Sequence, residues 1–267
     1  MAKSKIKIYR PESEFPELIV TVPASWPYIK LTPWYDVHRG HALHASPLFK
    51  RHREWFLREP YTLGWNGGDF FENVVEGSPG IWSQKMIPDE QFHDSAAILK
   101  PMVPKMLFAI PGNHEARTMR VAGVDLAKLL AEKVGLEYFP DYCFCTIKWR
   151  GMKFRICAHH GTGASASPGG QRNAAMKDIP WTNCDIWWTG HLHKSFADPV
   201  YRTDYDQRTD RMVSRTGFVI ISPSYLRYFG GYAAAKRLGP GSLGLAIATL
   251  RENGNIETTL HAKGNRL

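Results

Sequence analysis

Short apolar runs alternate with polar turns along most of the chain, and three longer segments repeat apolar positions at helical spacing. Short runs rich in apolar and β-branched residues predict strands, whereas the helical repeat predicts amphipathic helices. The expected strands are Ile6–Tyr9, Leu18–Val22, Tyr28–Pro33, Tyr61–Trp65, Lys105–Ile110, Phe144–Trp149, Lys153–Ala158, Asp185–Thr189, Arg211–Ser222, Leu243–Leu250 and Ile256–His261. The expected helices are Pro47–Arg58, Pro88–Lys100 and Val124–Val134.

The order of these elements predicts a layered α/β domain with a sheet on each side of the core. Strands followed by helices in the first two thirds indicate βα units, and the C-terminal part, 211–262, is β-rich with a hairpin turn at Arg251–Asn255. No internal repeat or long linker divides the chain, so we expect one domain over residues 1–267. The Gly-rich segments Gly161–Gly170 and Gly230–Gly244 are expected to be connections or lids.

Composition narrows the class of protein. Of the 267 residues 43% are hydrophobic and 22% charged, which is ordinary for a globular domain and excludes collagen-like and disordered chains. No apolar run is long enough to span a membrane and no secretory signal opens the chain, so we expect a cytoplasmic protein without a membrane partner. The oligomeric state stays open, a homo-oligomer included.

Charge and cysteine usage add two further expectations. The net charge of +9 favours nucleic acid or phosphorylated substrates, although scattered basic residues also suit a merely soluble surface. The four cysteines form no CxxC pair, so reduced and buried thiols are expected. Cys143 and Cys145 lie two positions apart in an expected strand and should share one face.

Five short polar motifs follow the expected strands. They are Asp36-Val-His38, Gly68-Asp69, Gly112-Asn113-His114-Glu115, His159-His160-Gly161 and Gly190-His191-Leu192-His193. Ligand sites of α/β sheets lie beyond the carboxyl ends of strands, and Asp, Asn and His are metal-binding side chains. One such motif carries little information, but five at strand ends predict a metal centre.

In this order, D-x-H, G-D, G-N-H-E, H-H-G and G-H-x-H, the motifs resemble those of the calcineurin-like metallophosphoesterase superfamily. The resemblance spans residues 36–193, more than half of the chain. It implies a β-sandwich flanked by helices and an active site that holds two metal ions.

The resemblance also implies a ligand set, taken residue by residue. The first ion would be bound by Asp36, His38, Asp69 and His193, and the second by Asp69, Asn113, His159 and His191. Asp69 would bridge the two ions. His159 is preferred to His160 as the ligand from the H-H-G motif, which leaves His160 either facing the substrate or packed in the core. Mixed nitrogen and oxygen ligation suits Mn, Fe, Zn, Co or Ni, so the metal stays open.

The implied reaction is hydrolysis of a phosphoester by a metal-bridging hydroxide, with Asp69 holding the ions and His114 as general acid. Glu115 would orient the imidazole of His114. Phosphodiesters are favoured slightly, on the basic charge and on His114. A phosphomonoesterase and a nuclease are alternatives, and a non-enzymatic binding scaffold is disfavoured because every ligand position is filled.

Several residues beside the motifs are candidates for contact with the substrate, a small phosphoester or a nucleic acid. Arg39, Arg117 or Arg120 would grip a phosphate oxygen, solvated surface arginines being the alternative. Glu72, three residues after Asp69, would be a hydrogen-bond acceptor behind the ligands or a residue at a helix start that interacts with the helix dipole. The stretch 225–232 interleaves aromatic and basic residues, for which packing is preferred to base stacking.

Overall fold

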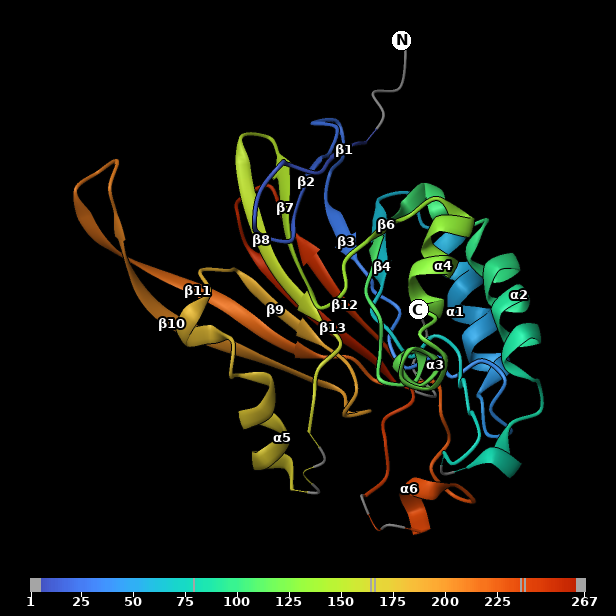
Figure 1. Cartoon of the computed structure of the whole chain (residues 1–267). Coiled ribbons are helices and arrows are strands. Elements are labelled where there is room, and N and C mark those ends of the chain that lie inside the picture. Colours follow the sequence, from blue (N-terminus) through green and yellow to red (C-terminus); the bar gives the residue numbers. More distant parts are fainter. Residues whose placement is uncertain are drawn as a thin grey trace.

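Two β-sheets pack face to face, and helices cover both of their outer surfaces (Figure 1). The computed structural model describes residues 6–78, 80–163, 165, 167–235, 237 and 239–262. The α/β layering that the sequence predicts is therefore confirmed, with one sheet on each side of the core.

The larger sheet has seven strands in the order β1-β2-β7-β8-β9-β11-β10, and the smaller has six in the order β13-β12-β3-β4-β5-β6. The strands of the larger sheet are β1 (Lys7–Tyr9), β2 (Glu17–Thr21), β7 (Tyr142–Trp149), β8 (Met152–His159), β9 (Ile186–Thr189), β10 (Phe196–Asp206) and β11 (Arg211–Ile221). Those of the smaller sheet are β3 (Ile29–Leu31), β4 (Thr62–Asn66), β5 (Met106–Ala109), β6 (Glu137–Tyr138), β12 (Gly244–Leu250) and β13 (Ile256–Ala262).

Six α-helices and three short 3₁₀ turns complete the described part of the chain. The helices are α1 (Ser46–Arg58), α2 (Pro88–Leu99), α3 (Glu115–Ala122), α4 (Leu126–Val134), α5 (Pro168–Ala175) and α6 (Tyr232–Ala235). The 3₁₀ turns are η1 (Ile81–Ser83), η2 (Val103–Lys105) and η3 (Ile179–Trp181).

The main core fills the space between the sheets. It includes alternate residues of each strand, such as Cys143, Cys145 and Ile147 of β7, which are fully buried. A second apolar cluster lies between the smaller sheet and α1 and α4, and a third includes Ala175 of α5 on the outer face of the larger sheet. All four cysteines are buried and free, as the sequence predicts.

The direction of the strands brings the polar motifs to one place. Strands β3, β4 and β5 are parallel to one another in the smaller sheet, and β8 is parallel to β9 in the larger one. One of the five motifs lies at or shortly after the end of each of these five strands. Because parallel strands end at the same edge of a sheet, their motifs gather there.

Most expected elements are present with ends shifted by a few residues, but the sequence reading missed β6, β10, α3, α5 and α6. β10 contains three aspartates and a proline, and its outer half is exposed, so it lacks the apolar pattern of a strand; eleven pairs with β11 define it instead. α3 buries only Glu115, so it lacks an apolar stripe. Within the described residues, no helix has the length and apolar character needed to cross a membrane.

A buried histidine in α1 makes the fold sensitive to acid. His52 is 1% exposed and its Nδ1 lies 2.9 Å from the hydroxyl of Tyr225. Burial, with a smaller contribution from the charge of Arg51, lowers the pKa of His52 from 6.5 to about 4. Because the folded-state pKa is below the unfolded one, the stabilisation is complete above pH 6.5 and is lost as the pH falls towards 4.

We therefore expect the free energy of unfolding of His52→Gln to depend less steeply on pH than that of the wild type. Between pH 4 and pH 6.5 the two slopes should differ by about 1 kcal/mol per pH unit, because the variant takes up one proton fewer than the wild type on unfolding. Urea denaturation of metal-free protein across this range measures it. Parallel pH profiles would show that His52 does not stay neutral in the folded protein.

Candidate functional site

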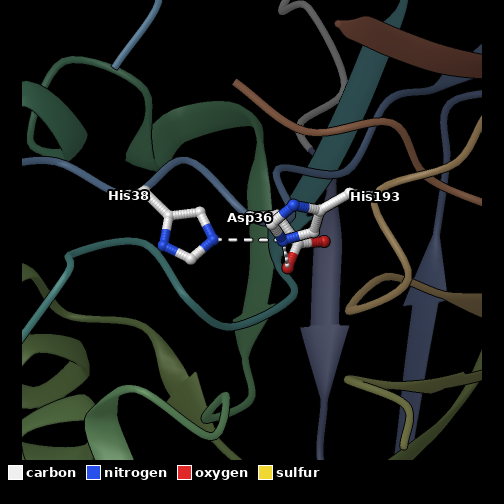
Figure 2. A group of neighbouring side chains, drawn as sticks. All are labelled: Asp36, His38 and His193. Atoms are coloured by element: carbon white, nitrogen blue, oxygen red, sulfur yellow. Dashed lines mark hydrogen bonds and ion pairs between the residues drawn. The ribbon is translucent and has the colours of Figure 1, made fainter. Parts of the chain in front are cut away.

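Two histidines and an aspartate form the first group of metal-ligating side chains. Asp36 and His38 follow β3, and His193 follows β9. The Nε2 atoms of His38 and His193 lie 3.2 Å apart, and Nε2 of His193 lies 3.2 Å from Oδ1 of Asp36 (Figure 2). One ligand atom from each residue lies within 4.8 Å of the others, which is a spacing that can hold a metal ion.

The donor chemistry of this group fits a cation. Asp36 is fully buried, and its Oδ1 accepts no well-oriented hydrogen bond in the described part of the chain, although Nε2 of His193 lies 3.2 Å away. A buried carboxylate oxygen without a partner is costly, and two ring nitrogens aimed at each other compete for one proton. A divalent cation would accept electron pairs from all three atoms.

Asp69 is shared by the other two groups. One group is His38, Asp69 and His114, and the other is Asp69, His160 and His191. Oδ2 of Asp69 lies 3.3 Å from Nε2 of His160. The structure therefore brings one carboxylate between clusters from both sheets, which is where a bridging ligand would lie.

Asn113, which follows β5, joins the group around His160 and His191. Its Oδ1 lies 2.7 Å from Nδ1 of His191 and 3.2 Å from Nε2 of His160. The backbone N–H of His191 donates to Oδ2 of Asp36 over 2.8 Å, which connects this group with the first. An amide oxygen and two ring nitrogens thus converge on one point beside Asp69.

Hydrogen bonds at the far side of each ring select the nitrogen that faces the cluster. Nδ1 of His38 lies 2.8 Å from the carboxylate of Glu72, and Nδ1 of His160 lies 2.9 Å from the carbonyl of Gly67. Nε2 of His191 lies 2.9 Å from the carbonyl of Gly163. Each acceptor holds a proton on the outer nitrogen and directs the inner nitrogen at the cluster, an arrangement typical of metal-ligating histidines.

Backbone strain is concentrated in the same residues. Asp36, His38, Asp69, His191 and His193 all have φ between 50° and 65°, a left-handed conformation that costs about 1 kcal/mol or more for a residue other than glycine. Such strain persists where the surrounding structure imposes it, and it clusters at functional sites. Five strained residues with their side chains in one cluster therefore make this place the candidate functional site.

Glu115 stabilises the turn that presents Asp69. Its buried carboxylate accepts hydrogen bonds from the backbone N–H groups of Asp69, Phe70 and Gly112 over 2.8–2.9 Å. A Cβ at Gly112 would lie 2.1 Å from Oδ1 of Asp69, so the close approach of these turns requires glycine. The expectation that Glu115 orients the imidazole of His114 is therefore corrected, because its carboxylate instead binds backbone donors.

The partners of His114 are Glu72 and Arg117. Nδ1 of His114 lies 2.6 Å from the carbonyl oxygen of Glu72, and its Nε2 lies 2.9 Å from Nη2 of Arg117. The guanidinium of Arg117 also donates to the Glu72 carbonyl over 3.0 Å. Glu72 thus positions His38 through its carboxylate and positions His114 and Arg117 through its carbonyl, in keeping with the acceptor expected at this residue.

Protonation in the site follows the competition between burial and nearby carboxylates. Burial lowers the pKa of His38 to about 3 and that of His114 to about 4, so both are neutral at neutral pH. Burial also opposes a charge on His160, but the negative charge of Asp69 outweighs it and raises the pKa of His160 to about 10. The buried carboxylates thus attract positive charge to the centre of the site.

The adjacent residues His159 and His160 do not lie where the sequence analysis expects them. His159 is the last residue of β8 and its Nε2 lies 2.7 Å from Oδ2 of Asp178, with its ring against Tyr142. His160 carries the ring that faces Asp69. This corrects the placement expected for both residues: His159 belongs to the outer face of the larger sheet, and His160, not His159, lies with Asp69 and His191 in a group that could hold a metal ion.

The arginines expected to bind phosphate are divided between two places. Arg117 lines a cavity of about 390 Å³ together with the metal-ligating residues. Arg39 forms a 2.6 Å ion pair with Asp94 of α2 and does not line that cavity, so the structure gives no support to its expected contact with the substrate. Arg227, a basic residue of the stretch 225–232 noted in the sequence, also lines the cavity. Sequence reasoning missed Lys194, another lining residue, whose one signal was its position directly after the last motif.

This placement gives a direct test of the ligand assignment. We expect His160→Ala to weaken Mn²⁺ binding by more than about 100-fold, because changes to groups that merely support a ligand already cost about 10–100-fold. His159→Ala is the matched control and should retain wild-type affinity. Isothermal titration of both variants with Mn²⁺ decides the assignment, and loss of affinity in the His159 variant alone would reverse it.

No protein-family model matches the chain, and a search of curated proteins found no match.

Proposed function

We propose that the chain is a dinuclear metal-dependent phosphoesterase with the calcineurin-like fold, and that phosphodiesters are its preferred substrates. The observation that carries the proposal is the convergence of Asp, Asn and His residues from five strand ends around the shared carboxylate of Asp69, with a strained backbone at the residues from three of those ends. The order of the five motifs along the chain supports the same family.

The described side chains offer two ligand sets. Asp36, His38, Asp69 and His193 would hold one ion; Asp69, Asn113, His160 and His191 would hold the other. Two such ions activate water and neutralise charge on the phosphate during an in-line displacement. The protein fixes the ligands through Glu72, Gly67 and Gly163, which orient the rings, and through Glu115, which stabilises the Asp69 turn.

Two residues next to the ligands act on the substrate. Arg117 lies on the cavity wall and would pair with a phosphate oxygen. His114 keeps one proton on Nδ1, which is bound to the Glu72 carbonyl, so its Nε2 is the atom that exchanges protons. In the free protein, Nε2 lies next to the positive charge of Arg117, which disfavours a proton there. A bound phosphate anion would offset that charge and favour the protonated Nε2. His114 would then donate that proton to the leaving oxygen.

Hydrolysis of simple nitrophenyl esters tests the proposal. We expect protein loaded with Mn²⁺ to hydrolyse bis(p-nitrophenyl) phosphate, EDTA to abolish the activity, and added Mn²⁺ to restore it. Faster hydrolysis of p-nitrophenyl phosphate would favour the monoesterase. Metal-loaded protein that hydrolyses neither ester would contradict the proposal and favour a binding scaffold. Activity that EDTA leaves intact would also contradict it.

A further inference from the structure

Two exposed aromatic side chains belong to residues that lie beside the lining of the cavity along the chain. Trp82 is 97% exposed and Phe229 is 81% exposed, the two highest values among the large apolar side chains of the described residues. Trp82 lies in η1, between Gly80 and Ser83, which line the cavity. Phe229 follows Tyr228, another lining residue. Two separate segments of the cavity wall therefore each carry an exposed aromatic ring.

The aromatic residues of the stretch 225–232 fall into a buried group and a group beside the cavity. Tyr225 is 1% exposed and stacks on Trp34 in the core, as the packing interpretation expects. Tyr228 and Phe229, by contrast, form an edge-to-face pair with ring centroids 5.1 Å apart, beside the cavity. Packing thus explains the first aromatic residue but leaves the face of Phe229 open.

The lining of the cavity is positively charged outside the metal-ligating cluster. Arg117, Lys194 and Arg227 line it. Within the described part of the chain, its only carboxylates are Asp69 and Glu72, both buried at its base. Arg227 is exposed and forms no ion pair with any described residue. Lys194 also forms no ion pair with a described residue, whereas Arg117 lies 3.9 Å from a carboxylate oxygen of Glu72. Lys194 and Arg227 are therefore the cavity cations whose charge is most available to phosphate groups.

We propose that the site accepts single-stranded nucleic acid, an inference that rests on the proposed phosphodiesterase activity. Bases stack on Trp82 and Phe229, while Arg117, Lys194 and Arg227 contact the phosphates on either side of the metal centre. Aromatic platforms interleaved with cations are how proteins hold unpaired bases, whose faces are free to stack. In a duplex those faces are already stacked within the helix, so a single strand fits these rings better.

Fluorescence anisotropy with a labelled phosphorothioate oligothymidylate, which resists hydrolysis, tests the proposal on Mn²⁺-loaded protein. We expect Trp82→Ala and Phe229→Ala each to weaken binding about tenfold, since one lost base stack has an effect of that order. Tyr201→Ala is the matched control: Tyr201 is 79% exposed, but it lies on the β10–β11 hairpin and does not line the cavity. The Tyr201→Ala variant should bind the oligonucleotide with the affinity of the wild type.

Salt dependence gives a second readout on the same complex. Three phosphate contacts predict a slope of about −2 for the logarithm of the binding constant against the logarithm of salt concentration. Arg227→Ala should reduce that slope by about 0.7. Wild-type affinity in both aromatic variants, or tighter binding of a duplex of the same length, would overturn the proposal.

The outcomes separate this inference from the proposed function. Protein that hydrolyses bis(p-nitrophenyl) phosphate but does not bind the oligonucleotide would retain the proposed activity and lose the nucleic-acid substrate. Protein that binds the oligonucleotide through Trp82 and Phe229 but hydrolyses no ester would retain the binding surface and lose the phosphoesterase.

Discussion

Asp69→Asn should lower kcat on a phosphodiester by about 10³-fold or more, since the interactions that depend on both ions supply several kcal/mol in the transition state. Asparagine keeps the shape of the turn, because its amide oxygen can still accept the 2.8 Å hydrogen bond that the N–H of His114 donates to Oδ1. It removes the charge from Oδ2, the atom that faces His160 and His114. The loss therefore reports on ligation rather than on folding.

Asp178→Asn is the control for this substitution. Asp178 is also a buried aspartate beside a histidine, His159, but it lies on the outer face of the larger sheet. We expect that variant to keep its metal content and kcat. Steady-state kinetics and metal analysis of both variants make the comparison, and an Asp69→Asn protein with near wild-type turnover would exclude Asp69 as a bridging ligand.

His114→Ala should slow the hydrolysis of diesters with poor leaving groups by about 10²–10⁴-fold, the range typical of a lost general acid. Diesters that release p-nitrophenolate should be affected far less, because that oxygen departs without a proton. The imidazole is held between the Glu72 carbonyl and Arg117, 3.8 Å from the carboxylate of Asp69, and it belongs to neither proposed ligand set, so its removal leaves the ligands in place.

The measurement is kcat/KM across diesters of graded leaving-group pKa, with metal content determined for each protein. His93→Ala, an exposed histidine of α2, is the control and should follow the wild type. A steeper dependence in the His114 variant is the expected result. Parallel lines would mean that His114 binds substrate uniformly and donates no proton.

The site can be predicted from the sequence because each of its metal-binding residue types lies close to the end of an expected strand. Asp36, Asp69, Asn113, His191 and His193 all lie within a few residues of the end of an apolar run. Parallel strands end at the same edge of a sheet, so these residues are expected to lie together even when no contact between distant segments is known. The same reasoning predicts the two sheets and α1, α2 and α4, whose apolar residues recur at regular spacing.

The choice between His159 and His160 depends on register, which one sequence does not reveal. The expected strand ended at Ala158, so that His159 was the first residue beyond it. Pairing of Tyr142 with His159 extends β8 by one residue, and side chains alternate across a strand. His159 therefore shares the outer face with Cys157, and His160 is the residue that reaches the space between the sheets.

Contacts between distant segments were also hidden from the sequence. Glu115 was expected to support its neighbour His114, but its carboxylate reaches the turn after β4. Arg39 was expected at the substrate, but α2 brings Asp94 to it. Neither partner lies near its residue along the chain, so only the folded structure reveals them.

The number of transition-metal ions bound by each active chain tests the central claim most directly. Elemental analysis of protein at full diesterase activity should find two ions per chain, because two ligand sets share Asp69. Both ions should be lost together with activity on chelation. Full activity with a single ion per chain, or with none, would contradict the dinuclear site.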